Sequence, residues 1–250
     1  MIFFVTGGSR GIGEAVVIEA ARQGHDVAFT YNTGAERAER VLAAARDVAQ
    51  KATSNGRFFA YQLDVRDSEA VESVGDRVLD DLGSVDVVVP NAGMNINGLA
   101  ANMPDEDWKT VIDTNLNGTF YVCRQFLPTM VKKRFGRIIM ISSLGSKGVT
   151  GQAAYAASKA GLLGLSATLS KEYGRKGITS NVLVLGFFET DMTREGMSAS
   201  NRDFWLKYNP LGRLGELPEI AKTVMFLASE GAGYITGDAI NITGGLDWAP

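Results

Sequence analysis

A tyrosine and a lysine four residues apart could exchange a proton with a bound substrate. Tyr155 and Lys159 stand in the segment Tyr-Ala-Ala-Ser-Lys, and residues i and i+4 share one face of a helix. A free phenol has a pKa of about 10, and a neighbouring ammonium group lowers that pKa because it favours the phenolate. The pair predicts acid–base chemistry near neutral pH, although the same spacing also occurs by chance on many helices.

Three polar side chains stand where they could assist this pair. Ser142 and Ser143 follow the apolar run 137–141, so their hydroxyls should lie at the carboxyl edge of a sheet and could hold a substrate carbonyl oxygen. Asn115 falls within a helical pattern among apolar neighbours, where a buried amide needs a hydrogen-bond partner. It is either part of the site or a structural amide.

A glycine-rich turn follows the first apolar run. Gly7, Gly11 and Gly13 form the pattern G-x-x-x-G-x-G, which removes side chains where a pyrophosphate would approach the backbone and precedes a helix that aims free N–H groups at it. A tight turn without a ligand could use the same glycines, but the position between the first strand and the first helix favours a dinucleotide. The expected contacts from this turn are Gly7, Ser9, Arg10, Gly11, Ile12 and Gly13.

The choice between NAD and NADP depends on charge near the adenosine ribose. An acidic residue after the second strand would bind the hydroxyls of NAD, yet this chain has Tyr31 and Asn32 there and no carboxylate before Glu36. Arg10 lies in the phosphate turn, where a guanidinium could pair with a 2′-phosphate. NADP(H) is therefore the predicted cofactor; the alternative for Arg10 is an exposed arginine with no ligand.

Composition excludes several other kinds of site. A Ser-His-Asp triad or a metal site is not expected, because the chain has one histidine, His25, in a predicted turn, and one cysteine. The lone Cys123 allows no internal disulfide and favours a reducing, cytoplasmic compartment. The net charge of −3 is spread over the chain, which predicts no nucleic-acid partner. No apolar run approaches the ~20 residues of a membrane span.

Short apolar runs alternate with helical patterns along the chain. The expected strands are Ile2–Val5, Asp26–Thr30, Phe58–Leu63, Val85–Val89, Arg137–Ile141, Asn181–Leu185 and Ala239–Ile242. The expected helices are Ile12–Gln23, Ala35–Ala52, Glu69–Leu82, Asp105–Val131, Ala153–Tyr173 and Glu219–Leu227. This alternation predicts one α/β domain over residues 1–250, a Rossmann-type doubly wound parallel sheet with helices on both faces.

Residues 186–215 have weak periodicity and predict a substrate lid. Several apolar side chains in the lid could line an apolar cleft, and the alternative is that they pack the lid onto the core. These residues are Phe187, Phe188, Met192, Met197, Phe204, Trp205 and Leu206.

Together these motifs resemble the short-chain dehydrogenase/reductase family over essentially the whole chain, and most closely its 3-oxoacyl-carrier-protein reductase branch. Each motif alone is unspecific, but the combination is highly specific. The further motifs that carry the resemblance are Leu63-Asp64-Val65, Asn91-Ala92-Gly93, Thr190-Asp191-Met192 and Tyr234-Ile235-Thr236-Gly237.

The resemblance assigns a role to each candidate. It implies that Tyr155 donates the proton and that Lys159 lowers the pKa of Tyr155 and holds the nicotinamide ribose. Ser143 or Ser142 would orient the carbonyl, and Asn115 would anchor a water that feeds protons to Lys159. The implied cofactor contacts beyond the first turn are Tyr31, Asn32, Asp64, Val65, Asn91, Ala92, Gly93, Tyr155, Lys159, Gly186, Phe188 and Thr190.

The chain departs from the family pattern at three places. Pro90 replaces an asparagine, which removes a backbone donor and a side-chain amide, and Leu185 replaces a proline, which we expect to loosen the lid. Alignment on the strand selects Ser143 as the catalytic serine, whereas the family's commonest spacing to Tyr155 selects Ser142. We favour Ser143, because a deletion in the following loop is easier than a register slip that turns every strand side chain over.

We therefore expect NADPH-dependent reduction of a ketone to a secondary alcohol, with a 3-oxoacyl thioester as the leading substrate. The alternatives are a polyketide, steroid or sugar-alcohol oxidoreductase and, from a different class, a non-catalytic NADP-binding regulator. The resemblance also implies a homotetramer and docking of an acyl carrier protein at Arg134 and Lys176, which we expect near the mouth of the cleft. Both cations could instead be ordinary solvated helix ends.

Overall fold

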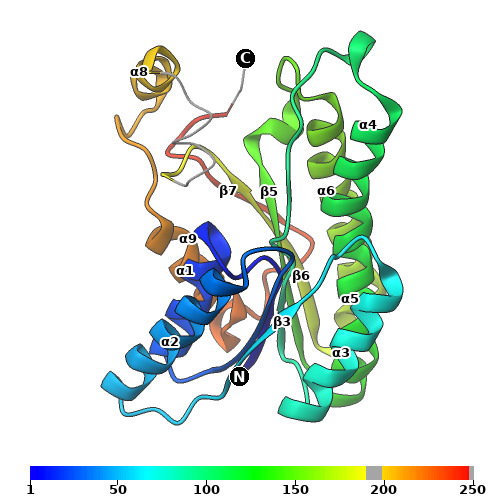
Figure 1. Ribbon diagram of the computed structural model, residues 1–250, viewed down its shortest axis with the longest axis vertical. Coiled ribbons are helices and arrows are strands. Elements are labelled where there is room, and N and C mark those ends of the chain that lie inside the picture. Colours follow the sequence, from blue (N-terminus) through cyan, green and yellow to red (C-terminus); the bar gives the residue numbers. More distant parts are fainter. Residues whose placement is uncertain (190–198, 248–250) are drawn as a thin grey trace.

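The central sheet consists of seven parallel strands in the order β3-β2-β1-β4-β5-β6-β7 (Figure 1). The computed structural model describes residues 1–189 and 199–247. The inner strands are apolar on both faces because helices cover both sides of the sheet. The strands are β1 (Ile2–Val5), β2 (Asp26–Tyr31), β3 (Phe58–Gln62), β4 (Val87–Val89), β5 (Gly136–Ser143), β6 (Ile178–Leu185) and β7 (Ala239–Ile242).

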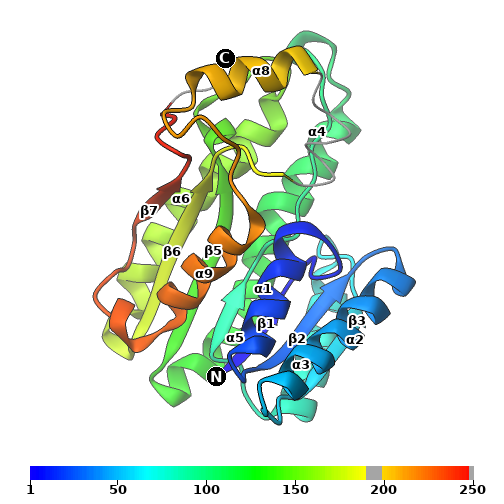
Figure 2. The ribbon, with the colours of Figure 1, turned by 90° about the vertical axis from the view of Figure 1, so that its left-hand side faces the viewer.

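Helices form a layer on each face of this sheet (Figures 1 and 2). One apolar core lies between the sheet and α1, α2 and α9, and a second lies between the sheet and α3, α5 and α6. No helix in the described part of the chain is long and apolar enough to cross a membrane. The α-helices are α1 (Gly11–Arg22), α2 (Ala35–Lys51), α3 (Ser68–Leu82), α4 (Asp105–Ile112), α5 (Gly118–Lys133), α6 (Ala153–Tyr173), α8 (Ala199–Tyr208) and α9 (Leu217–Ala228).

The predicted α/β fold is confirmed, and all seven strands lie within a few residues of their expected positions. Local capping explains several helix starts. Asp67 accepts hydrogen bonds from the backbone N–H groups of Glu69 and Ala70 at the start of α3. A capping box of Glu216 and Glu219 begins α9, and both devices satisfy N–H groups that a helix leaves unpaired.

The expected helix Asp105–Val131 is interrupted. Its middle residues, Asp113–Asn117, form a π-helical turn (η2) between α4 and α5. Hydrophobic periodicity does not reveal one extra residue in a turn, so the sequence pattern gave a single helix. The π turn brings Asn115 to a fully buried position, and such turns occur often at functional sites.

The lid contains a helix that was not expected, α8, which lies above the carboxyl edge of the sheet (Figure 2). Trp205 on α8 is buried and stacks on Phe187 with ring centroids 4.0 Å apart. It also packs with Leu144 and Leu246. For Trp205 the alternative that it packs the lid onto the core is therefore correct, whereas Phe204 is partly exposed. Met192 and Met197 lie outside the described residues.

Candidate active site

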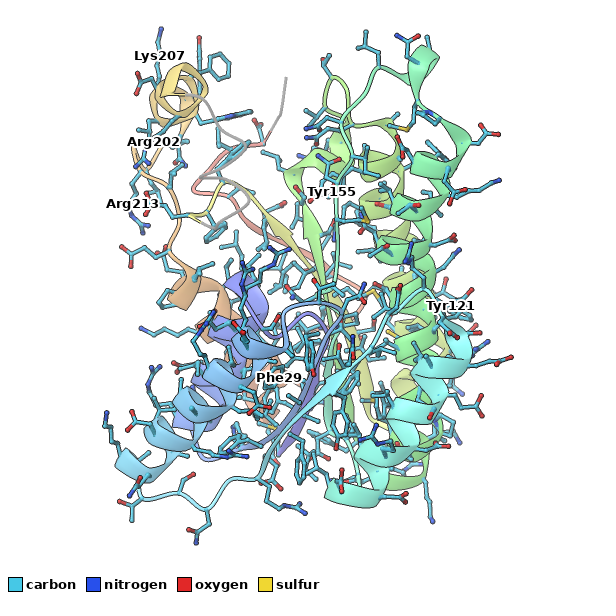
Figure 3. The ribbon with its side chains drawn as sticks, viewed as in Figure 1. Phe29, Tyr121, Tyr155, Arg202, Lys207 and Arg213 are labelled. Atoms are coloured by element: carbon cyan, nitrogen blue, oxygen red, sulfur yellow. The ribbon has the colours of Figure 1, made fainter. Side chains whose placement is uncertain are left out.

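Tyr155 lies on the first turn of α6, at the carboxyl edge of the sheet (Figure 3), and Lys159 lies one turn further along the helix. The Lys159 side chain is buried, and its Nζ donates a hydrogen bond of 2.8 Å to the carbonyl oxygen of Ile141 on β5. This Nζ lies 5.8 Å from the centroid of the Tyr155 ring. Burial lowers the pKa of Lys159 to about 8, because desolvation disfavours the charged ammonium.

Tyr155 behaves differently from the expectation for its pKa. Burial raises the pKa of Tyr155, and a hydrogen bond with Ser143 offsets part of that rise. The expected net lowering of the Tyr155 pKa is therefore wrong in direction, because desolvation of the phenol is the largest influence on it. A raised pKa keeps the phenol protonated at neutral pH, which suits a proton donor.

The two neighbouring serines have different surroundings. Ser143 shares a hydrogen bond with Tyr155, and its Oγ accepts one of 3.1 Å from the backbone N–H of Gly145. Ser142 is buried on the other side of β5, and its Oγ donates to the carbonyl oxygen of Lys159 at 2.9 Å. The Ser143 hydroxyl is thus the one beside the phenol, whereas the Ser142 hydroxyl bonds to the backbone of α6.

Asn115 connects α6 to the segment that follows β4. Its Oδ1 accepts from the backbone N–H of Met94 at 2.8 Å, and its Nδ2 donates to the Met94 carbonyl at 2.9 Å. The same Nδ2 donates to Ser158 Oγ at 3.0 Å, and Ser158 donates to the carbonyl of Tyr155 at 2.8 Å. Sequence reasoning missed Ser158, although its position three residues after Tyr155 places both on one helix face.

The glycine-rich turn leaves a set of backbone donors available. Within the described residues, the N–H groups of Gly11, Ile12 and Gly13 donate no hydrogen bond. Gly13 has no room for a side chain, since an added Cβ would lie 2.3 Å from the carbonyl oxygen of Gly7. At Gly11 an added Cβ would meet nothing within 4 Å. The start of α1 therefore presents three free backbone N–H groups, an arrangement that can bind a phosphate group.

The turn is held to the end of β4 by a residue that the sequence analysis missed. Thr6 Oγ1 accepts hydrogen bonds of 3.0 Å from the backbone N–H groups of both Asn91 and Ala92. Asn91 in return donates from Nδ2 to the carbonyl of Thr6 at 2.9 Å. Next along the chain, an added Cβ at Gly93 would lie 3.3 Å from Lys159 Nζ. The threonine that follows β1 thus fixes the Asn91-Ala92-Gly93 segment beside the lysine.

The residues expected at the adenosine end also lie along this edge. Arg10 is exposed, and its side chain makes no hydrogen bond or ion pair with the residues that the structure describes. Tyr31 is the last residue of β2, and Asn32 follows it. Asp64 pairs with Arg66 at 2.6 Å, and this hydrogen-bonded pair lowers the pKa of Asp64.

The four remaining residues predicted to contact the cofactor are Val65, Gly186, Phe188 and Thr190. Val65 is buried in the core beside α5. Gly186 approaches β7 so closely that an added Cβ would lie 2.8 Å from the Cα of Thr243. The ring of Phe188 packs in the core against Gly215, so only its backbone could meet a cofactor. Thr190 lies outside the described residues.

The two predicted docking cations come together, but not near the cleft of their own chain. Arg134 precedes β5 and donates to the carbonyl of Arg175 at 3.1 Å, beside Lys176 before β6. Tyr155 lies beyond the other end of β5, a strand of 8 residues that spans roughly 26 Å. The expectation of a patch near the mouth of the cleft is therefore wrong for a single chain. The sequence could have shown this position, because both cations precede predicted parallel strands and such residues lie at the amino edge of the sheet.

Comparison with known proteins identifies the family. Residues 7–247 match the family described as Enoyl-(Acyl carrier protein) reductase. The 3-oxoacyl-[acyl-carrier-protein] reductase FabG of Escherichia coli strain K12 is 42% identical over 248 residues, which cover 98% of this chain and 96% of FabG. The FabG of Staphylococcus epidermidis strain RP62A is 40% identical and is covered to 97% in both chains. The chain belongs to the short-chain dehydrogenase/reductase family.

A solved structure agrees with this assignment. A protein described as a short-chain alcohol dehydrogenase from Sinorhizobium meliloti 1021 superposes with a TM-score of 0.91 at 32% identity, covering 98% of this chain and 95% of the other. The short-chain dehydrogenase/reductase resemblance seen in the sequence is thus confirmed. The protein is an oxidoreductase that acts on CH–OH and C=O groups.

Proposed function

We propose that this protein is an NADPH-dependent 3-oxoacyl-[acyl-carrier-protein] reductase that works in the cytoplasm. The observation that carries the proposal is the start of α6, where Tyr155 bonds to Ser143 and the buried Lys159 lies next to them, at the edge where the free N–H groups of α1 also lie. Full-length identity of 40–42% to reductases of that name supports the substrate class.

The residues present fit NADPH. The N–H groups of Gly11, Ile12 and Gly13 would hold the pyrophosphate, and the unpaired Arg10 would meet the 2′-phosphate. NADPH supplies the hydride that reduces the carbonyl carbon. Because no carboxylate precedes Glu36 after β2, nothing at this end favours the bare ribose of NAD.

The chain's own groups manage the carbonyl oxygen and the proton. Ser143 Oγ and Tyr155 Oη would both donate to the substrate oxygen, and the raised pKa of Tyr155 keeps its proton available. The proton passes from Tyr155 to the alkoxide oxygen as the alcohol forms. Lys159, with a pKa of about 8, is charged at neutral pH and would stabilise the phenolate that remains.

The direct test follows NADPH oxidation with a panel of ketones. We expect turnover with the 3-oxobutanoyl thioester of N-acetylcysteamine, a short untethered analogue, and faster turnover when the same acyl group is tethered to an acyl carrier protein. Turnover of a steroid or sugar ketone without turnover of either thioester would replace the substrate class. Cofactor binding without turnover of any ketone in the panel would favour the non-catalytic regulator.

We further propose that the protein is a homotetramer and that Arg134 and Lys176 dock the acidic carrier protein. Since both cations lie at the amino edge, the acyl arm would enter the cleft of a neighbouring copy. Reversing both charges with Arg134→Glu and Lys176→Glu should weaken turnover of the carrier-bound substrate in a salt-dependent way, because such contacts act largely through steering. The untethered thioester is the control and should be unaffected. Equal effects on both substrates, or a monomer in solution, would contradict the docking proposal.

A further inference from the structure

The lysine of the active-site turn is held at both of its ends by neighbouring residues of β5. Its Nζ donates to the carbonyl of Ile141 at 2.8 Å. Its backbone carbonyl accepts from the hydroxyl of Ser142 at 2.9 Å. Ser142 is 2% exposed, so its hydroxyl contacts the helix and not a ligand. Strand β5 thereby fixes the positions of both the backbone and the ammonium group of Lys159.

The opposite side of the same turn is held by a second buried serine. Ser158 Oγ donates to the carbonyl of Tyr155 at 2.8 Å and accepts from Asn115 Nδ2 at 3.0 Å. The other bonds of the Asn115 amide go to the backbone of Met94. The Ser158 hydroxyl and the Asn115 amide both have hydrogen-bond partners. Buried polar groups that are fully hydrogen-bonded favour a single arrangement of the side chains.

Between these two anchors the turn has little freedom. Gly93, which follows the segment fixed by Thr6, approaches Lys159 Nζ, and an added Cβ there would lie 3.3 Å from both Nζ and Asn115 Oδ1. No carboxylate pairs with the ammonium among the described residues, so its proton affinity depends on burial and on the position of the Ile141 carbonyl. A shift of the turn by a fraction of an ångström would change both.

We propose that Ser142 and Ser158 are positioning residues for the reaction: by anchoring the turn 155–159 from β5 and from the π turn η2, they set the placement of the Tyr155 phenol and the Lys159 ammonium. Neither serine touches the reacting atoms. Their effect comes through geometry, and misplacement of a catalytic group by about 1 Å costs on the order of 10²-fold in rate.

The chain provides a matched control on the same helix. Ser166 is also on α6, is 1% exposed and bonds to the hydroxyl of Ser180 on β6 at 2.9 Å. Ser142→Ala and Ser166→Ala each remove one buried hydrogen bond and Ser158→Ala removes two, so all three variants should lose melting temperature, Ser158→Ala the most. The proposal requires that kcat fall about tenfold in Ser142→Ala and Ser158→Ala and stay within twofold in Ser166→Ala, with KM for the ketone unchanged in all three. Equal kcat in the three variants would overturn it.

A second measurement needs no substrate. The titration of Lys159 can be followed by NMR in protein with labelled lysines, with the signal assigned by its loss in Lys159→Ala. We expect the midpoint to move by at least about half a pH unit in Ser142→Ala and Ser158→Ala, and not in Ser166→Ala. The variant Ser158→Cys, which keeps a weak donor of similar size, should recover part of both effects. An unchanged midpoint in both alanine variants would contradict the proposal even if kcat fell.

The turn 155–159 would serve the reduction of any ketone by this protein. The serine variants can therefore be tested with whichever ketone the panel identifies as a substrate. Failure of the 3-oxoacyl substrate would not alter the lysine titration. Conversely, an active 3-oxoacyl reductase whose serine variants match Ser166→Ala would leave the proposed function intact and remove this inference.

Discussion

Two buried charged groups, Asp86 at the amino edge of the sheet and Lys159 at the carboxyl edge, have different kinds of partner. At the amino edge, Asp26 pairs with Arg57 at 2.6 Å, and the buried Asp86 pairs with Lys133 and also accepts from the backbone N–H of Ile2. At the carboxyl edge, the ammonium of Lys159 bonds to a backbone carbonyl, and no carboxylate pairs with it in the described ranges. The buried Asp86 thus has an opposite charge as its partner, whereas the buried Lys159 has a neutral carbonyl.

The presence or absence of an opposite charge decides whether a buried group contributes to stability or can exchange protons. A charge that is paired keeps its ionised state over a wide pH range, whereas an unpaired buried cation has its pKa lowered into the range where it can exchange protons. The carboxyl edge therefore carries a group with a pKa of about 8. Variants at that edge should change turnover, and variants at the amino edge should change the free energy of unfolding.

Tyr155→Phe should have the largest effect on turnover. It removes the hydroxyl that delivers the proton, so we expect nearly all ketone reduction to be lost while the melting temperature and NADPH binding change little. Stopped-flow NADPH oxidation and fluorescence titration of the cofactor measure the two quantities. Activity above a tenth of the original value would mean that another group supplies the proton.

The serine beside the phenol should come next. Ser143→Ala removes a donor to the carbonyl oxygen, which we expect to cost about 10²-fold in kcat, whereas Ser142→Ala should cost about tenfold through positioning. Steady-state kinetics on both variants rank the two serines. A larger loss in Ser142→Ala would show that the strand register and the chosen catalytic serine are wrong.

Arg10→Ala tests a cation at the carboxyl edge whose partner is expected to be a ligand. One charge-assisted hydrogen bond contributes about 1.5–3 kcal/mol, so the KM for NADPH should rise at least tenfold while the KM for NADH barely changes. The ratio of the two values is the readout. If the unmodified enzyme uses NADH and NADPH equally well, the assignment of Arg10 fails.

The pH dependence of reduction should reflect Lys159. Its pKa is lowered from 10.5 to about 8 by burial, so the ammonium is present below that value and lost as pH rises through it. We expect kcat for ketone reduction to be level between pH 6 and 7 and to fall with a midpoint near 8. A kcat that stays constant up to pH 10 would place the essential proton elsewhere.

Asp86→Ala should have the smallest effect on turnover. It leaves the N–H of Ile2 and the ammonium of Lys133 without their carboxylate, at a cost of about 1–3 kcal/mol. For a chain of this size the melting temperature should fall by roughly 2–4 °C per kcal/mol, with kcat unchanged. A large loss of kcat in Asp86→Ala protein that is fully folded would show that a change at the amino edge affects catalysis at the carboxyl edge.

The sequence predicted the positions that local patterns determine. Short apolar runs located the strands, and the helical patterns between them located most of the helices. Spacing located Tyr155 and Lys159 on one helix face. These features depend on residues close together in the chain, which is why one sequence is sufficient to find them.

Features that depend on contacts between distant segments were missed or wrong. The role of Thr6 requires β4 to lie next to β1, and the direction of the pKa shift of Tyr155 depends on how deeply the folded chain buries it. The docking cations were predicted near the mouth of the cleft, but they lie at the amino edge because they precede parallel strands. Helix α8 was missed because its apolar residues follow no helical period.

The π turn η2 (Asp113–Asn117) sets the angular phase between two helices. One residue of an α-helix corresponds to a rotation of about 100°, so deleting any one residue between 112 and 118 would turn α4 by that angle relative to α5. The amide of Asn115 would leave its buried position, and a different side of α4 would face α6. Insertions and deletions at this point should therefore be tolerated far less than in the surface loops, even though the segment lies within what looks like an ordinary helix.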